Sequence, residues 1–140
     1  MTSQTLGLVS LVVRDYDEAL AFYVGKLGFK LVEDSFVPEQ NKRWVVIEPS
    51  GAAGAGSKLL LARGVGDAQT SRIGNQTGGR VSLFLYTDDF WRDFKAYQAK
   101  GVEFAREPSQ APYGTVAVFK DLYGNLWDLV ELVSGGRSGT

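Results

Sequence analysis

The pattern of apolar and polar segments predicts a series of strands and helices that occurs twice along the chain. Short apolar runs rich in β-branched residues predict strands, and apolar residues at helical spacing predict helices. The first series is a strand at 6–13, a helix at 15–28 and strands at 29–37, 43–47 and 58–62. The second series is a strand at 80–87, a helix at 88–101 and strands at 102–106, 115–120 and 126–132. Both series therefore run strand, helix, strand, strand, strand.

Both predicted helices have recognisable ends. Asp15 stands where a helix cap is expected, and Glu18 follows three residues later, which is the spacing of a capping box. Gly28 ends this helix, because glycine accepts the left-handed conformation that helix ends often require. In the second series Asp89 corresponds to Asp15 and Gly101 to Gly28, with one residue fewer between them. An internal repeat of this kind is stronger evidence for a fold than any single element.

The repeat predicts an α+β fold: two βαβββ modules forming a curved mixed sheet, with the helices on its outer face. Each module alone would leave an apolar sheet face exposed, so we expect the two modules to pack together. We expect residues 1–140 to form a single domain, with module one at about 6–62 and module two at about 80–132. The polar, glycine-rich segment 63–79 is the expected linker, and the tail 134–140, which lacks large apolar residues, is expected to be disordered.

Composition narrows the possible functions. The chain has 15 Lys and Arg against 16 Asp and Glu, so no basic excess points to a nucleic-acid partner. The longest apolar run, 19–24, is too short to cross a membrane, and the first residues lack a secretory pattern, so we expect a soluble, cytoplasmic protein. The chain contains no cysteine and no histidine, which excludes disulfides, thiolate ligands and imidazole catalysis.

Several motifs are typical of one known family. They are the stretches 11–19 (LVVRDYDEA), 27–29 (LGF), 86–89 (YTDD), 101–104 (GVEF), 113–119 (YGTVAVF) and 121–128 (DLYGNLWD), with Phe22 and Tyr23 in the first helix. Through these motifs the chain resembles the glyoxalase/bleomycin-resistance/dioxygenase superfamily, whose members are also called vicinal oxygen chelate proteins. The resemblance covers about residues 6–132. It implies the two-module fold but no particular function, because one fold hosts many chemistries.

The resemblance also implies four metal-ligand positions, and this chain departs from the family at most of them. The opening strands carry Leu8 and Ser82 where the family has His or Gln, and the closing strands carry Leu60 and Asp128 where it has Glu or His. Only Asp128 is a strong ligand, and one carboxylate with one hydroxyl makes a poor site for zinc, nickel or iron. We therefore expect no metal and no other cofactor. Members of the family without a metal bind antibiotics in the same cleft.

Strand alternation then predicts which residues line that cleft. The expected ligand-binding residues are Leu8, Ser10, Lys58, Leu60, Ser82, Phe84 and Tyr86. Asp128 is the candidate catalytic residue, because a carboxyl group among apolar residues can act as acid or base. Alternatively it forms an ion pair with Lys58, Arg43 or Arg80. Phe84 and Tyr86 can stack on an aromatic ligand, but core packing is the favoured role of Phe84, and it is the expected role of Trp44 and Trp127.

Three functions are consistent with these sequence features. The leading hypothesis is a metal-independent protein that binds a small apolar or aromatic ligand, like the bleomycin-resistance proteins. The second is a glyoxalase-like lyase or isomerase, similar to lactoylglutathione lyase or related to the dioxygenases, that uses Asp128. The third is a dimeric interaction module without a small ligand. The family resemblance also implies a homodimer.

Overall fold

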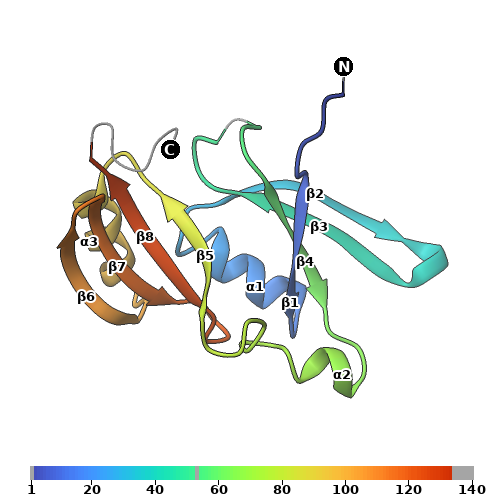
Figure 1. Cartoon of the computed structure of the whole chain (residues 1–140). Helices are drawn as coiled ribbons and strands as arrows, with labels where there is room; N and C mark the ends of the chain where they lie inside the picture. Colours follow the sequence, from blue (N-terminus) through green and yellow to red (C-terminus); the bar gives the residue numbers. More distant parts are fainter. Residues whose placement is uncertain (1, 53, 134–140) are drawn as a thin grey trace. The chain divides into compact units, whose positions relative to one another are not determined.

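The computed structural model describes residues 2–52 and 54–133, and the chain divides into two compact units between Ile73 and Gly74 (Figure 1). Each unit contains one module. The predicted disorder of the tail at 134–140 concerns residues outside the described part of the chain.

The first unit is a four-stranded sheet with one helix of eight residues. Its elements are β1 (Leu8–Val13), α1 (Tyr16–Tyr23), β2 (Lys30–Val37), the 3₁₀ turn η1 (Pro38–Gln40), β3 (Lys42–Glu48), β4 (Lys58–Arg63) and the short helix α2 (Asp67–Thr70). The strand order is β1-β4-β3-β2. β1 pairs with β4 in parallel, and the other pairs are antiparallel, so the sheet is mixed.

The second unit repeats this arrangement. Its elements are β5 (Val81–Tyr86), α3 (Phe90–Ala99), β6 (Phe104–Ala111), β7 (Gly114–Lys120) and β8 (Leu126–Leu132). The strand order β5-β8-β7-β6 matches that of the first unit, and β5 again pairs in parallel with the last strand of its module. The α+β fold with two βαβββ modules is thereby confirmed, and the strands form two mixed four-stranded sheets, one in each module.

The predicted starts of both helices and the predicted end of α3 are confirmed. The predicted end of the first helix at Gly28 is wrong, because α1 ends at Tyr23, five residues earlier. The Asp15 side chain accepts a hydrogen bond from the Glu18 amide at 2.9 Å, and Asp89 accepts one from the Arg92 amide at 3.2 Å. These bonds satisfy amides that have no partner within the helix. Gly101 follows α3 with φ +83°, in the left-handed region that favours glycine.

Each sheet is buried on the face that its helix covers. In the first unit Leu11, Val13, Leu59, Leu61 and Ile47 are buried on the side of α1. In the second unit an aromatic core joins α3 to the sheet. Its ring centroids lie 4.6 Å apart for Phe94 and Phe104, 5.4 Å for Tyr97 and Phe119, and 5.7 Å for Phe119 and Trp127. The packing role expected for Trp127 agrees with its burial.

Two further elements differ from the prediction. The expected linker contains α2, whose four residues are too few to show a helical period. The strand predicted at 102–106 lies at Phe104–Ala111 and passes through Pro108. β6 is an edge strand, where a missing backbone N–H costs little, and its register shifts between Arg106 and Ser109.

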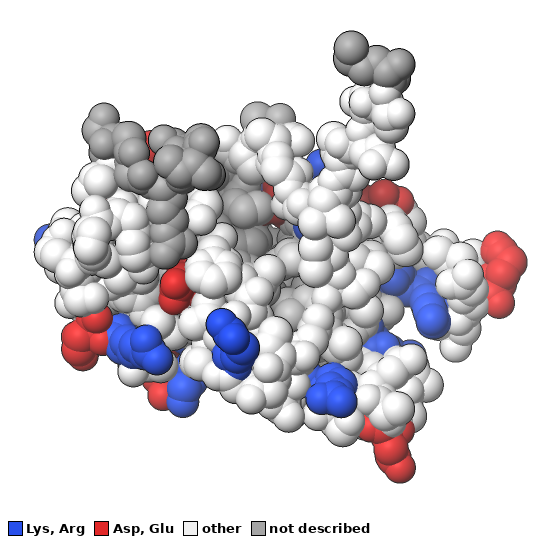
Figure 2. All heavy atoms as spheres, viewed as in Figure 1, with Lys and Arg blue, Asp and Glu red and all other residues white. Residues whose placement is uncertain are grey.

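Charges of both signs are mixed over the surface that Figure 2 shows. In the part of the chain that the structure describes, no helix has the length and apolar character needed to span a membrane.

Candidate functional site

The first candidate surface is the sheet face of module one that points away from α1. On this face Ser10 of β1 and Val46 of β3 flank Leu60 of β4 in the strand register. Leu8 pairs with Lys58 one step further along, on the same face. Leu8 and Ser10 are exposed, and Lys58 and Leu60 are half-buried. Four of the predicted ligand-binding residues therefore share one sheet face.

Trp44 belongs to the same face. It alternates with the buried Val45, which lies on the α1 side, and it is 39% exposed. The expected packing role of Trp44 is therefore wrong: β3 presents the indole to solvent, because the helix that would bury it lies on the opposite face.

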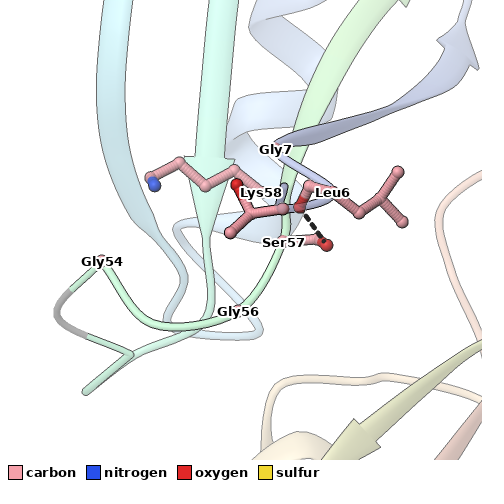
Figure 3. Close-up of a pocket in the computed structure, with 7 residues that line it drawn as sticks. Leu6, Gly7, Gly54, Gly56, Ser57 and Lys58 are labelled. Atoms are coloured by element: carbon pink, nitrogen blue, oxygen red, sulfur yellow. Dashed lines mark hydrogen bonds between the residues drawn. The ribbon is translucent and has the colours of Figure 1, made fainter. Parts of the chain in front are cut away.

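A pocket opens at one end of this sheet. It has a volume of about 450 Å³ and is lined by Thr5, Leu6, Gly7, Gly54, Gly56, Ser57 and Lys58 (Figure 3). The Ser57 hydroxyl donates to the carbonyl oxygen of Leu6 at 2.7 Å and ties the N-terminal segment to the start of β4. Lys58 belongs to both the pocket and the sheet face.

Glu48 is a polar residue that the sequence analysis did not select. It is the last residue of β3 and alternates with Val46 and Trp44, so it lies on the face opposite α1. Its side chain is buried, and its Oε1 atom accepts no hydrogen bond from the described residues. The strand had been predicted to end at residue 47, one residue too early. Extending the apolar–polar alternation by one position would have placed this carboxylate on the same face.

The second candidate surface is the sheet face of module two that points away from α3. Phe84 pairs with Asp128, and Tyr86 pairs with Val130, between β5 and β8. Leu85 and Trp127, which alternate with these residues, are buried on the α3 side. Phe84 is 53% exposed and Tyr86 is 56% exposed. Core packing of Phe84 is therefore wrong, and both aromatic rings lie on an accessible surface beside a half-buried carboxylate.

Ser82 differs from the other residues of β5 in its strand pairing and in its side-chain contact. The register of β5 against β8 shifts between Val81 and Leu83, which places Ser82 at an irregular position. Its hydroxyl lies 3.0 Å from the Thr77 hydroxyl, which also donates to the Arg80 carbonyl oxygen at 2.7 Å. Ser82 therefore takes part in a contact that fixes the start of the strand.

The two aspartates of the 121–128 motif occupy different environments. Asp121 is buried and accepts hydrogen bonds from the amides of Tyr123 and Asn125, the Asn125 side chain and the Trp127 indole. Its carboxylate organises the turn before β8. Asp128 is half-buried on the face opposite α3, next to Phe84. The motif thus combines one structural carboxylate with one that lies on the candidate surface.

Arg43 lies on the other face of module one. It forms ion pairs with Asp34 at 2.8 Å and Asp17 at 2.9 Å, and its guanidinium lies 5.1 Å from the centre of the Tyr16 ring. The hydrogen bond from Arg43 lowers the pKa of Asp34 below its ordinary value. Arg43 thus fastens α1 to the sheet.

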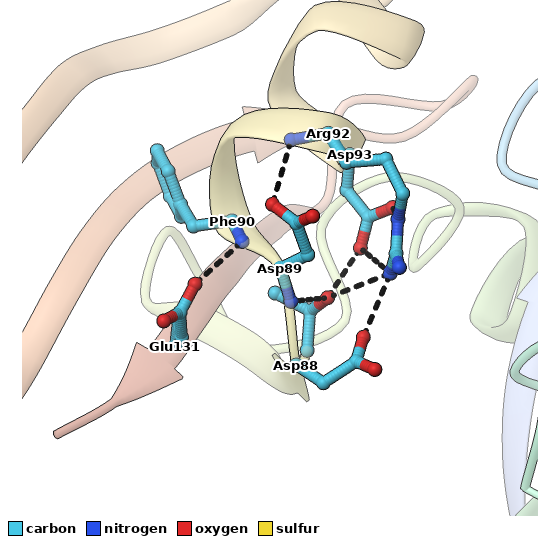
Figure 4. Close-up of polar contacts among 7 residues, drawn as sticks. Asp88, Asp89, Phe90, Arg92, Asp93 and Glu131 are labelled. Atoms are coloured by element: carbon cyan, nitrogen blue, oxygen red, sulfur yellow. Dashed lines mark hydrogen bonds and ion pairs between the residues drawn. The ribbon is translucent and has the colours of Figure 1, made fainter. Parts of the chain in front are cut away.

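A third polar cluster surrounds the start of α3 (Figure 4). Glu131 accepts a hydrogen bond from the Phe90 amide at 2.7 Å, and Arg92 forms ion pairs with Asp88 at 2.8 Å and Asp93 at 3.0 Å. The hydrogen bond from Arg92 lowers the pKa of Asp88. Because these groups satisfy one another and the helix amides, the cluster anchors α3 to β8.

The residues at the family's metal positions do not fit a metal ion. Leu8 and Leu60 offer only hydrocarbon, and the Ser82 hydroxyl is in contact with Thr77. Among residues 2–52 and 54–133, no group of three or more His, Cys, Asp or Glu side chains is placed to hold a metal ion. The donor set at these positions is thus one carboxylate and one hydroxyl, too few for a stable transition-metal site.

Comparison with known proteins identifies the family. Residues 5–129 match the model of the Glyoxalase/Bleomycin resistance protein/Dioxygenase superfamily. An uncharacterized protein of Shewanella frigidimarina is 57% identical over 129 residues, which cover 92% of this chain and 94% of that protein. The crystal structure of UcmS2 matches with a TM-score of 0.77 at 28% identity, covering 93% of this chain and 98% of that one.

A second solved structure is TnmS3, an antibiotic binding protein from Streptomyces sp. CB03234. It matches with a TM-score of 0.73 at 30% identity, covering 95% of this chain and 99% of TnmS3. The family match spans most of the chain, and the repeated βαβββ modules agree with it. The chain belongs to the glyoxalase/bleomycin resistance protein/dioxygenase superfamily.

Proposed function

We propose that this protein binds a small apolar or aromatic molecule on its exposed sheet faces, without a metal ion. The observation that carries the proposal is the pair of exposed rings of Phe84 and Tyr86 beside the half-buried Asp128. Aromatic side chains on a regular, rigid strand provide flat contact area at low entropic cost, and a nearby polar group orients the ligand.

Two further observations support this proposal. The positions that hold a metal in other family members carry side chains unsuited to one, so ligand binding must rest on apolar contacts and hydrogen bonds. TnmS3, which resembles this chain over nearly its whole length, is an antibiotic binding protein. An aromatic antibiotic is therefore the first ligand class to test.

The test is a thermal-denaturation screen of the chelator-treated protein against aromatic antibiotics, followed by calorimetric titration of any compound that raises Tm. We expect saturable binding that Phe84→Ala and Tyr86→Ala each weaken by roughly tenfold, because each removes ~1–1.5 kcal/mol of ring contact. Phe36→Ala is the matched control, since Phe36 is an exposed aromatic residue on β2 of module one.

Equal binding by the wild type, both variants and the control would refute the assignment of this face. Failure of every aromatic antibiotic to bind would refute the proposed function.

A further inference from the structure

We infer that Glu48 is the hydrogen-bond acceptor for a hydroxyl or ammonium group of the ligand, on the face of module one opposite α1. This inference rests on the proposed function and specifies the ligand: an apolar body that carries an O–H or N–H donor. It also assigns a binding role to a residue outside the family's metal positions.

The first argument is the unsatisfied state of the Glu48 carboxylate. The residue is 4% exposed, yet its Oε1 atom has no hydrogen-bond partner within the described residues. Buried polar atoms nearly always have a partner, because burial without one forfeits the hydrogen bonds made to water. A carboxylate accepts strongly and, when ionised, has no proton to donate. The group that completes this site is therefore a donor.

The second argument is the position of Lys58. The register of β3 against β4 pairs Ile47 with Leu59, so the next residues along, Glu48 and Lys58, face each other across the two strands. No ion pair between them is found within 4.0 Å in the described structure. In Figure 3 the Lys58 side chain extends from β4 toward the neighbouring strands. Its four-carbon chain is flexible, so it can move aside when a ligand approaches.

The surroundings supply the apolar part of the site. Trp44 and Leu8 are exposed on the same face, and Leu60 is half-buried between their strands. A ligand whose ring rests against these side chains can direct a hydroxyl or ammonium group toward Glu48. An acceptor-only group at the same place would face the unpaired Oε1, so the site should discriminate against ethers.

The competing explanation is purely structural: Glu48 and Lys58 form an ion pair with each other in solution. The two explanations differ in stability as well as in binding. If the Glu48 carboxylate has no partner until a ligand binds, Glu48→Leu removes an unsatisfied buried group and leaves Tm unchanged or higher. If the ion pair holds the sheet together, Glu48→Leu and Lys58→Met both lower Tm.

The experiment uses three probes of one shape: 2-naphthalenemethanol, its methyl ether and 2-naphthylmethylamine. Binding to the 140-residue chain is measured by the chemical-shift changes of its Leu and Val methyl groups. We expect the alcohol and the amine to bind the wild type roughly tenfold more tightly than the ether, because only they donate to Glu48. Glu48→Leu should bind all three alike, and Lys58→Met should keep the preference for the donors.

Glu48→Gln separates the two donors. It keeps an acceptor oxygen but removes the charge, so the alcohol should retain most of its affinity and the amine should lose its advantage.

Equal affinity of the alcohol and the ether for the wild type would overturn the inference, while the proposed function would stand. Retention of the donor preference in Glu48→Leu, or a fall of Tm in both Glu48→Leu and Lys58→Met, would also overturn it. Failure of all three probes to bind would overturn the inference too. The proposed function is tested separately, by the screen with aromatic antibiotics.

Discussion

Asp121→Asn is the substitution whose effect the structure defines most sharply. Asp121 is 5% exposed, and its Oδ1 accepts from the amides of Tyr123 at 3.0 Å and Asn125 at 2.9 Å. Its Oδ2 accepts from the Asn125 side chain at 3.0 Å and the Trp127 indole at 3.2 Å. Asparagine has the same shape and can keep the two bonds to the backbone, but it places an NH₂ group where two donors converge.

The side-chain amide of Asn125 reduces the number of hydrogen bonds that the substitution removes. The Oδ1 atom of Asn125 has no hydrogen-bond partner in the described structure, so a flip of this amide lets it accept from the new NH₂ group. The flip also moves the Asn125 NH₂ group to the position where Oδ1 had no partner, so this group and the Trp127 indole both lose their bond to residue 121. An unpaired buried donor costs about 1–3 kcal/mol, and exchanging charge-assisted bonds for neutral ones costs about 1 kcal/mol more. Because two donors lose their acceptor, the expected loss of unfolding free energy is at least about 3 kcal/mol.

Thermal and urea denaturation followed by circular dichroism measure this loss. We expect Tm to fall by at least about 9 °C, at roughly 3–4 °C per kcal/mol for a domain of this size. In a Trp127→Phe background the substitution should lower the unfolding free energy by less, because one of the two donors that lose their acceptor is absent. Asp88→Asn is the control: the Asp88 side chain is 87% exposed, so its removal should leave Tm nearly unchanged. A shift for Asp121→Asn as small as that of the control, or an undiminished shift in the Trp127→Phe background, would refute the reasoning.

Two further predictions concern stability. Because Arg43 lowers the pKa of Asp34 from 3.8, the ion pair stabilises the fold above about pH 4 and this contribution is lost as pH falls through the lowered pKa. Arg43→Met should therefore reduce stability at pH 7, and the difference from the wild type should shrink in denaturation series toward pH 2; a constant difference would contradict the linkage. Gly101→Ala should lower the free energy of unfolding, measured by urea denaturation, by about 1 kcal/mol. Gly101 has φ +83°, and an added Cβ would meet no atom within 4 Å, so backbone strain alone causes the loss. An unchanged urea midpoint would contradict the left-handed conformation at this position.

The repeat was the part of the fold that the sequence determined best. Asp15 and Asp89 form local caps, and β8 matches its predicted bounds at Leu126–Leu132, because caps and alternating strands depend on residues close in the chain. The helix α2 was not predicted, since four residues carry no measurable period. The length of β6 depends on pairing with β7, which local pattern does not report.

The candidate site was predicted in part. Alternation placed Leu8, Ser10, Lys58 and Leu60 on one face, as the structure has them. It also placed Phe84 on the cleft face, but core packing was the favoured role there, because an aromatic residue in a strand looks the same in sequence on a covered face as on an open one. Glu48 was missed because the residue that ends a strand is the least certain part of any prediction, and its unsatisfied oxygen is visible only with side chains in place.

Metal dependence of ligand binding tests the central claim most directly. The purified protein is assayed for bound metal and titrated by calorimetry with an aromatic antibiotic that raised Tm, after chelation and again with added Zn²⁺ or Ni²⁺. We predict saturable binding with the same Kd in all states and no stoichiometric metal, because Leu8, Leu60 and Ser82 cannot complete a coordination shell with Asp128. A stoichiometric metal whose removal abolishes binding would contradict the account.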